Sequence, residues 1–282
     1  MKVLTTRKEV ETHLQKHLSD KDFIGFVPTM GALHKGHLSL IDESKKNNKV
    51  TVASIFVNPT QFDNPDDLKK YPRTFDKDVK LLENIGCDFV FAPSVNEIYQ
   101  ESIDSESFDF DGLENEMEGK CRIGHFDGVG TIVKTLFKII QPNTAYFGEK
   151  DFQQLQIIKK MVKKNKLPVK VIGCPIYRES NGLAMSSRNE RLSKDQRENA
   201  SIIYSTLKEI KSRFESATIS ELKKLVENKF ENHPKFKLEY FSIANEETLK
   251  PVQDIKLENH YRAFIAVYAG SIRLIDNLAL YN

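Results

Sequence analysis

The sequence contains few cysteines, and their arrangement argues against two kinds of covalent or metal cross-link. Cys87, Cys121 and Cys174 are odd in number, lie far apart and form no Cys-x-x-Cys pair. Disulfide frameworks and structural zinc sites both require closely organised cysteines, so neither is expected. We interpret the three residues as buried thiols that pack as small hydrophobic side chains.

Long apolar runs and an excess of charge of either sign are missing as well. No apolar stretch approaches the ~20 residues that cross a bilayer, and residues 1–7 lack the apolar core of a signal peptide. The 282 residues have a net charge of +2. Up to Arg178 the chain holds 26 basic and 25 acidic residues, and after it 16 and 15. Neither part has the basic excess of a nucleic-acid-binding domain. We expect a cytoplasmic protein that binds neither nucleic acid nor membrane.

Short apolar runs alternate with amphipathic helical stretches in the first part of the chain. We predict strands at 23–27, 50–57, 88–92, 145–147 and 169–176, and helices at 36–48, 75–85, 126–140 and 152–164. The run 50–57 is almost continuous in apolar and β-branched residues, which is typical of a parallel strand. This alternation predicts an α/β protein with a parallel doubly wound sheet.

The pattern changes after Arg178. Capping boxes begin at Ser193 and Thr218, and they predict helices that run to about Phe214 and Glu231. Strands are predicted at 236–243, 261–268 and 272–275. Two helices followed by strands indicate a second, smaller α+β domain, so we divide the chain into domains 1–178 and 179–282. Within the first domain, the acidic segment 102–118 predicts a short edge strand followed by an exposed turn.

A His-x-Gly-His pattern, residues 34–37, lies between the first predicted strand and the following helix. Ligands of open α/β sheets bind beyond the carboxyl ends of the strands. Gly31 and Gly36 let the backbone approach a phosphate, and the helix N-terminus offers N–H donors. His34 and His37 can donate hydrogen bonds to charge that develops on a departing pyrophosphate. A capping or core histidine is the commoner role for either residue alone, but this placement favours an ATP site.

Two further blocks have the chemistry of a phosphate site. Gly148 follows the predicted strand 145–147, Lys150 can meet a phosphate, and Asp151 can accept from ribose hydroxyls or cap the next helix. Residues 185–189, Met-Ser-Ser-Arg-Asn, suit a mobile loop that closes over a triphosphate. For Asp151 alone a helix cap is at least as good an interpretation, and for 185–189 alone a turn with a surface arginine is favoured. Together with 34–37, however, the two blocks indicate one ATP pocket.

Two polar side chains are candidates for other ligands. Gln61, in the Asn-Pro-Thr-Gln-Phe loop after the second predicted strand, offers an amide to a polar substrate without phosphate. Asp78 can hold Mg²⁺ through water, since Mg²⁺ takes few carboxylates and keeps several waters. The alternatives are a loop amide bonded to the backbone and a solvated carboxylate at a helix start.

These blocks, in this order and spacing, closely resemble the pantothenate synthetase (pantoate–β-alanine ligase) family of the His-x-Gly-His nucleotidyltransferase superfamily. The resemblance covers nearly the whole chain and is densest in PTMGALHKGH, NPTQF, YPRT, GHFDGV, GEKDFQQL and MSSRN. It implies a Rossmann-like domain, a C-terminal lid domain, a homodimer and Mg²⁺-ATP as co-substrate. It also implies that (R)-pantoate attacks ATP to give pantoyl adenylate, from which β-alanine displaces AMP to give pantothenate, the precursor of coenzyme A.

The resemblance also implies roles for individual residues. As catalytic residues it implies His34, His37, Lys150, Ser186, Ser187 and Arg188. For ATP binding it adds Met30, Gly31, Gly36, Gly148, Asp151, Tyr177 and Met185. For the other substrates it implies Met30, Asn58, Gln61 and Gln154. The base that deprotonates β-alanine cannot be named from the sequence.

Three other interpretations compete with a pantoate–β-alanine ligase. Another His-x-Gly-His nucleotidyltransferase, such as a cytidylyl- or adenylyltransferase, would release pyrophosphate without an amine acceptor. An RNA-binding synthetase fragment is disfavoured by the balanced charge of both domains. A degenerate regulatory nucleotide-binding protein is disfavoured by the intact motifs.

Overall fold

The computed structural model describes residues 1–15, 23–62, 65–256 and 258–281, and the chain divides into two compact units. Unit 1 comprises Met1–Glu149 and Gln153–Pro175, and unit 2 comprises Lys150–Phe152 and Ile176–Asn282. The main change of unit lies close to the boundary predicted after Arg178. The assignment of Lys150–Phe152 to unit 2, while both neighbours belong to unit 1, has no counterpart in the sequence pattern.

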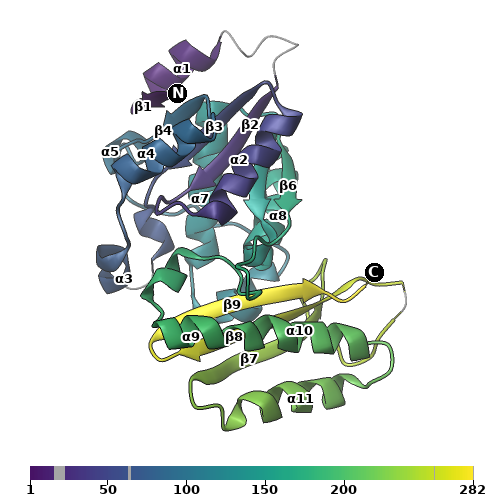
Figure 1. The fold of residues 1–282 in the computed structure, drawn as a ribbon. Coiled ribbons are helices and arrows are strands. Elements are labelled where there is room, and N and C mark those ends of the chain that lie inside the picture. Colours follow the sequence, from purple (N-terminus) through teal and green to yellow (C-terminus); the bar gives the residue numbers. More distant parts are fainter. Residues whose placement is uncertain (16–22, 63–64, 257, 282) are drawn as a thin grey trace. The chain divides into compact units, whose positions relative to one another are not determined.

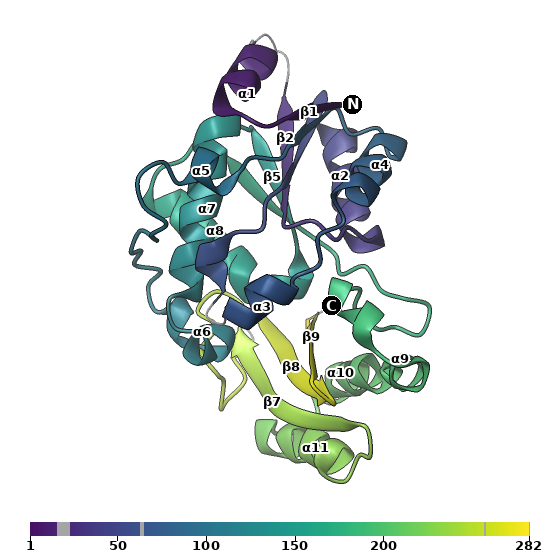
Figure 2. The ribbon, with the colours of Figure 1, turned by 90° about the vertical axis from the view of Figure 1, so that its left-hand side faces the viewer.

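A six-stranded parallel sheet forms the centre of unit 1 (Figure 1). Its strands are β1 (Lys2–Leu4), β2 (Ile24–Thr29), β3 (Val50–Ile55), β4 (Phe89–Phe91), β5 (Thr144–Gly148) and β6 (Lys170–Cys174). The helices of this part are α1 (Arg7–Leu14), α2 (Lys35–Asn47), α3 (Pro65–Lys70), α4 (Phe75–Asn84), α5 (Val95–Ile98), α6 (Met117–Cys121), α7 (His125–Ile140) and α8 (Phe152–Lys164). Figure 2 shows α2 and α4 on one side of the sheet and α7 and α8 on the other. The predicted doubly wound parallel sheet is confirmed.

The strand order reverses between β2 and β5. The order across the sheet is β1-β4-β3-β2-β5-β6, so the chain adds β3 and β4 on one side of β2, then β5 and β6 on the other. β2 and β5 are parallel and pair at Gly25↔Thr144 and Phe26↔Ala145. Their carboxyl ends therefore lie at the same edge of the sheet. In open α/β sheets this reversal point is where ligands bind.

The central strands are buried on both faces, which explains their continuous apolar sequences. Ile24, Phe26 and Val52 are fully buried. α2 packs so closely on β2 that a Cβ on Gly25 would lie 2.1 Å from Oγ of Ser44. A larger residue there would displace the side chain of Ser44, so glycine lets α2 pack closely on the strand.

Sequence patterns missed one strand and four helices of unit 1, namely β1, α1, α3, α5 and α6, and predicted one strand wrongly. β1 and α1 were not predicted, because three strand residues and eight helix residues give little periodicity. The edge strand predicted within 102–118 is wrong: residues 102–110 form no strand. Their backbone bonds go to side chains of α7 instead, since Phe108 N–H donates to Asp127 at 3.0 Å and Glu106 N–H to Thr131 at 2.8 Å.

Unit 2 is a three-stranded antiparallel sheet with helices packed against it. Its helices are α9 (Lys194–Asn199), α10 (Ser201–Arg213) and α11 (Ile219–Glu231), and its strands are β7 (Phe236–Asn245), β8 (Tyr261–Ala269) and β9 (Ile272–Ala279), in the order β7-β8-β9. Both predicted capping boxes are present, at Ser193 and Thr218. The first predicted helix is divided at Ala200 into α9 and α10. The predicted α+β character is confirmed.

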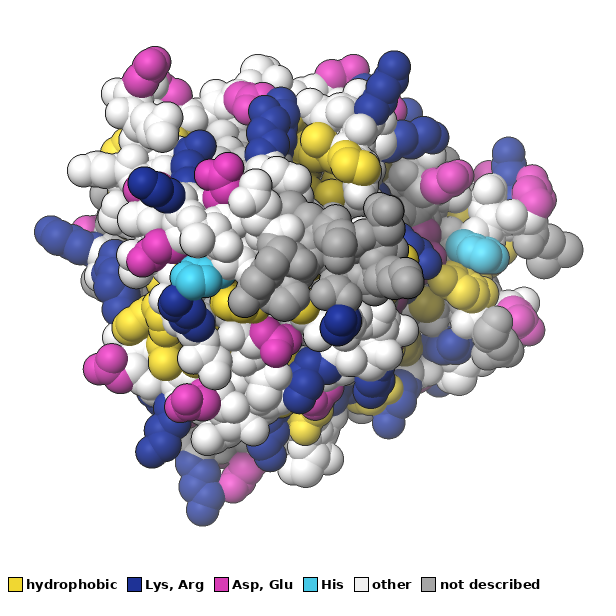
Figure 3. Space-filling view, turned by 90° about the horizontal axis from the view of Figure 1, so that it is seen from above, with side chains coloured by type: hydrophobic (Ala, Val, Ile, Leu, Met, Phe, Trp, Pro, Cys, Tyr) yellow, Lys and Arg dark blue, Asp and Glu magenta, His cyan; other side chains and the backbone are white. Residues whose placement is uncertain are grey.

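The surface carries both signs of charge. On the face drawn in Figure 3, lysine and arginine side chains are interspersed with aspartate and glutamate. Within the described parts of the chain, none of the helices combines the length and the apolar character that a membrane span requires.

Candidate active site

The two histidines of the His-x-Gly-His motif lie at the start of α2, beyond the carboxyl end of β2. His34 is the N-cap residue and His37 lies in the first turn, with ring centroids 4.0 Å apart. The backbone N–H of His34 donates to Nδ1 of His37 at 3.4 Å. Nδ1 is therefore an acceptor, and a neutral His37 ring carries its proton on Nε2. That tautomer leaves an N–H donor suited to a phosphate oxygen.

The loop between β2 and α2 has an unusual backbone. Gly31 and the next residue, Ala32, both have positive φ, 82° and 50°. The left-handed conformation costs a residue with a Cβ about 1–2 kcal/mol. Asp78, from α4, offsets this cost: it accepts from Ala32 N–H at 2.9 Å and from Leu33 N–H at 2.8 Å. The approach to the His-x-Gly-His turn is thus shaped by one distant carboxylate.

Asp78 is almost completely buried, with 1% of its surface exposed. Its Oδ2 also accepts from the hydroxyl of Thr74 at 3.1 Å. Across the described ranges there is no group of three or more His, Cys, Asp or Glu residues that could hold a metal ion. The side chains present therefore do not build a protein cage for Mg²⁺. A water-mediated contact from Asp78 stays a prediction.

The loop after β3 is held by the side chain of Asn58, which is fully buried. Its amide nitrogen donates to Gly128 O at 3.2 Å, and its oxygen accepts from the hydroxyl of Tyr99 at 2.6 Å and from Thr60 at 3.2 Å. Burial raises the pKa of Tyr99, so this hydroxyl keeps its proton. In this arrangement Asn58 fixes the loop, and the contact to substrate predicted for it stays untested.

Gln61, in the same loop, has its backbone position fixed by two residues that the sequence reasoning did not single out. Its carbonyl accepts from Nη2 of Arg122 at 3.1 Å and contacts Nδ1 of His125 at 2.9 Å. A carbonyl only accepts, so Nδ1 of His125 carries a proton; Nη1 of Arg122 then donates to Nε2 at 3.1 Å. The Gly-His-Phe-Asp-Gly-Val motif at 124–129 was the available signal for His125, and Arg122 lies just before it.

The end of β5 provides open space. At Gly148 an added Cβ would meet no atom of the described residues within 4 Å, its chain neighbours aside. Lys150 follows in a short 3₁₀ helix (Glu149–Asp151), and its ammonium lies 3.5 Å from the carboxylate of Asp151. Of the two glutamines that come next, Gln153 is structural, because its amide bonds Leu113 O and Glu116 O, both at 2.8 Å.

The Met-Ser-Ser-Arg block is presented by a hairpin of unit 2. Arg178 and Ala184 form an antiparallel bridge, and Met185 N–H donates to Tyr177 O at 2.9 Å. Tyr177 and Met185, both predicted to contact the nucleotide, are therefore linked directly. Ser186 caps the next 3₁₀ helix (Ser187–Arg191), and Arg188 at its start is exposed.

Each unit thus collects part of the predicted residues. Unit 1 places the following residues after β2, β3 or β5, or at the start of α8: Met30, Gly31, His34, Gly36, His37, Asn58, Gln61, Gly148 and Gln154. Unit 2 contains Lys150, Asp151, Tyr177, Met185, Ser186, Ser187 and Arg188. In unit 1 the three strands are neighbours in the sheet, so these groups share its carboxyl edge.

Comparison with known proteins identifies the family. A family model described as pantoate-beta-alanine ligase matches residues 2–279. The chain belongs to this family. Pantoate–β-alanine ligases join pantoate to β-alanine at the expense of ATP, so the resemblance, the ligase activity and the use of ATP predicted from the sequence are confirmed.

Individual relatives span the whole chain. Pantothenate synthetase of Flavobacterium psychrophilum is 55% identical over 99% of this chain and 100% of its own, and that of Christiangramia forsetii is 53% identical over the full length of both. Pantothenate synthetase from Thermus thermophilus superposes with a TM-score of 0.91 at 38% identity over both complete chains. The pantoate-beta-alanine ligase of Francisella tularensis was solved with β-γ ATP and β-alanine. It superposes with a TM-score of 0.80 at 37% identity over 99% of this chain and 98% of its own.

Proposed function

We propose that this chain makes pantothenate in two half-reactions at the predicted residues, and that the carboxyl edge of the unit 1 sheet is where pantoate is adenylated. The observation that carries the proposal is the strand reversal between β2 and β5. The histidine motif follows one of these two strands and Gly148 ends the other. A family that uses ATP would bind it at such a reversal.

In the first half-reaction the carboxylate of pantoate attacks the α-phosphorus of ATP. An oxygen–phosphorus bond forms, the bond from the α-phosphorus to the bridging oxygen breaks, and pyrophosphate leaves. The carboxylate is ionised at neutral pH, so this step needs no general base. It needs alignment and neutralisation of charge. His37 and His34 supply N–H donors at the N-terminus of α2, where the backbone also favours anions.

Further residues take the predicted parts in substrate binding. Gln61 and Gln154 orient pantoate through their amides, with Met30 packing beside it. Lys150 and Arg188 neutralise phosphate charge, while Ser186 and Ser187 donate hydroxyl hydrogen bonds. Asp151 accepts from the ribose, the backbone of Tyr177 lies against adenine, and Met185 contacts the nucleotide. Gly31, Gly36 and Gly148 let the nucleotide approach the backbone.

In the second half-reaction the neutral amine of β-alanine attacks the acyl carbon of the adenylate. A carbon–nitrogen bond forms, the bond between that carbon and the phosphate oxygen breaks, and AMP leaves. Gln61 also serves β-alanine, and the contacts of its carbonyl with Arg122 and His125 within unit 1, which fix its backbone, support this role. The proton that the amine loses is left without an assigned acceptor.

Three further features belong to this proposal. Asp78 is the residue that would reach Mg²⁺, through water, and the ion would supply charge neutralisation at the ATP phosphates. The chain acts as a homodimer, which sedimentation equilibrium tests directly. It works in the cytoplasm, which fractionation of the source cells tests.

The reaction is tested by isotope exchange between pyrophosphate and ATP. We expect exchange that depends on pantoate and not on β-alanine, with AMP released only after β-alanine is added. Absence of pantoate-dependent exchange in folded protein that binds ATP would overturn the assignment. Exchange with a different acid and no response to any amine would favour another nucleotidyltransferase.

A further inference from the structure

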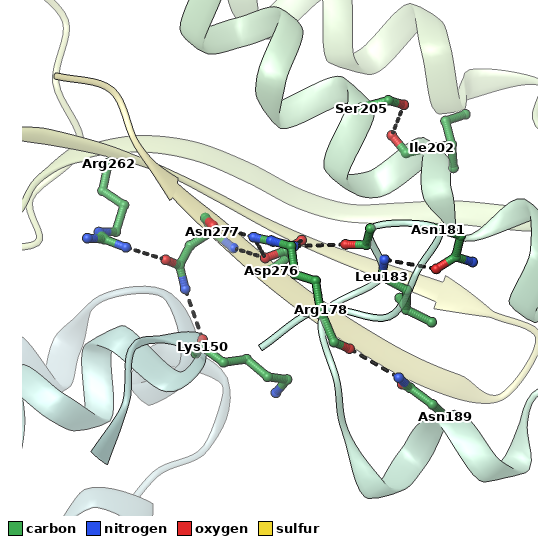
Figure 4. Close-up of polar contacts among 12 residues, drawn as sticks. Lys150, Arg178, Asn181, Leu183, Asn189, Ile202, Ser205, Arg262, Asp276 and Asn277 are labelled. Atoms are coloured by element: carbon green, nitrogen blue, oxygen red, sulfur yellow. Dashed lines mark hydrogen bonds and ion pairs between the residues drawn. The ribbon is translucent and has the colours of Figure 1, made fainter. Parts of the chain in front are cut away.

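Lys150 lies in a segment whose contacts differ from those of its chain neighbours. Glu149 and Gln153 belong to unit 1, whereas Lys150–Phe152 belongs to unit 2. Within unit 2, Asn277 on β9 donates from Nδ2 to the carbonyl of Lys150 at 2.9 Å (Figure 4). A few residues of the smaller unit therefore hold the backbone from which the Lys150 side chain extends.

The orientation of the Asn277 amide is dictated by Arg262 on β8. Nη1 of Arg262 donates to Oδ1 of Asn277 at 2.6 Å. A guanidinium has no acceptor, so the amide oxygen must face Arg262 and the amide nitrogen must face Lys150. Asn277 is 2% and Arg262 5% exposed, so water does not compete strongly for these bonds.

Arg262 also holds the other end of the segment. Its guanidinium lies over the ring of Phe152, 4.0 Å from the centroid, and the same ring packs against Phe264. Nε of Arg262 donates to Glu246 at 2.6 Å, which prevents the guanidinium from turning away. The backbone is thus fixed at Lys150 by a hydrogen bond and at Phe152 by packing.

β9 is itself anchored beside Asn277. The carboxylate of Asp276 accepts hydrogen bonds from Nη1 of Arg178 at 2.6 Å and from Nη2 at 3.0 Å (Figure 4). It also accepts from the backbone N–H of Asn277 at 2.7 Å. The guanidinium of Arg178 in turn stacks on the ring of Tyr204 at 3.7 Å. Asn277 is therefore held by its backbone as well as by its side chain.

We propose that Asn277, oriented by Arg262, is a positioning residue for Lys150 in the binding of the ATP phosphates. The proposal rests on the role of Lys150 in the proposed function. A lysine side chain is flexible, and because its backbone is already fixed, only the side chain must be ordered when phosphate binds. The ammonium of Lys150 lies 3.5 Å from a carboxylate oxygen of Asp151, whose side chain is half exposed. An exposed ion pair of this kind is weak, so the lysine can exchange it for a phosphate.

The test uses Asn277→Asp in the full-length protein. Aspartate keeps an oxygen for Arg262 but cannot donate to the carbonyl of Lys150. We expect kcat/KM for ATP in pantoate-dependent exchange to fall roughly tenfold, the loss of one hydrogen bond. The KM for β-alanine should not change. The control is Asn245→Asp at the end of β7, whose oxygen caps a turn that aspartate caps equally well.

The decisive comparison repeats the substitution in Lys150→Ala. If Asn277 acts through Lys150, the double variant is no slower than Lys150→Ala alone. Two results overturn the positioning role and leave the proposed function standing. One is an equal fall in kcat/KM when Asn277→Asp is added to the wild type and to Lys150→Ala. The other is full activity of Asn277→Asp when Lys150→Ala is impaired. Full activity of Lys150→Ala removes the phosphate role of Lys150 and the inference with it. If Asn277→Asp does not fold, Asn277→Ser, which cannot span both partners, gives the same comparison.

Discussion

The carboxylate of Asp78 accepts a hydrogen bond from the backbone N–H of Leu33 at 2.8 Å. One residue of α4 thereby controls the loop that leads from β2 into the histidine motif. The second oxygen accepts from Ala32, whose φ of 50° is strained for a residue with a Cβ. Strain of this kind persists only where surrounding contacts determine it, and it is common at functional sites.

We predict that Asp78→Asn lowers the rate of pantoate-dependent isotope exchange by about 10- to 100-fold and the free energy of unfolding by about 1–3 kcal/mol. An asparagine amide has only one oxygen, so its NH₂ group would face one of the two loop N–H donors and leave it without an acceptor. Steady-state kinetics and urea denaturation measure the two effects. Asp76→Asn is the matched control, since this exposed carboxylate lies on the same helix. If added Mg²⁺ restores the Asp78→Asn rate, Asp78 acts on the metal rather than on the loop.

A second prediction concerns the close contact between α7 and the loop that carries Gln61. A Cβ on Gly128 would lie 2.3 Å from Thr60 O, so Gly128→Ala must push that loop away from the helix. We expect the KM for pantoate to rise about tenfold or more, as misplacement by an ångström costs up to about 100-fold, while the KM for ATP changes less.

The control for this change is Gly130→Ala on the same helix. There a Cβ meets the ring of Phe108 at 2.9 Å, and not the backbone of the loop that carries Gln61. Both variants should lose stability in thermal denaturation, but only Gly128→Ala should affect pantoate. Equal effects of the two variants on the KM for pantoate would show that α7 as a whole, rather than the Thr60 contact, sets the position of Gln61.

His37→Ala provides the third prediction. Removing one charge-assisted donor to the phosphates should slow adenylate formation about 100- to 1,000-fold, the cost typical of a lost transition-state donor. Rapid-quench measurement of the first turnover reports this step. Lys35→Ala, an exposed residue of the same turn that has no assigned contact with ATP, should stay within about twofold of the wild type, since exposed substitutions that remove no contact have small effects. A collapse of the circular dichroism signal in His37→Ala would instead give His37 a structural role.

Sequence patterns identified the elements whose signal is local. Val50–Ile55 was predictable because a parallel strand buried on both faces is continuously apolar. Thr218 was predictable because a capping box needs only residues three apart. The histidine motif was recognisable because His34 and His37 lie in one turn between a strand and a helix.

Other parts of the site depend on residues that are distant in the chain. Asp78 reaches Leu33 across 45 positions, and Asn277 reaches the Lys150 carbonyl across 127. Such pairs leave no periodic trace in one sequence. For the same reason the sequence placed Lys150 in the first domain, although its contacts belong to unit 2. The segment 102–110 misled because alternating phenylalanines imitate a strand, whereas α7 side chains bind its backbone.

A fourth prediction concerns the thiols, which the sequence indicated to be buried. Cys87 and Cys174 are buried and Cys121 is exposed, so burial is confirmed for two and wrong for the third. Burial raises the pKa of Cys87 to about 12 and that of Cys174 to about 11. Since the thiolate is the reactive form, we expect a disulfide reagent at pH 8 to modify one thiol quickly and the other two only after denaturation. Cys121→Ser should abolish the fast phase.

The same shift makes stability depend on pH in the alkaline range. An unfolded Cys87 loses its proton near pH 9, the ordinary value, whereas the folded one keeps it to about 12. Between these pH values the folded protein keeps a proton on Cys87 that the unfolded chain has lost. The contribution of this thiol to the free energy of unfolding is therefore complete below pH 9 and falls as pH rises. The slope for one such group is about 1.4 kcal/mol per pH unit. Urea denaturation of wild type and Cys87→Ala between pH 8 and 10.5 measures it. Cys87→Ala should have a lower free energy of unfolding at pH 8 and should lose less of it by pH 10.5 than the wild type. If the free energies of the two proteins fall in parallel, Cys87 does not cause the pH dependence.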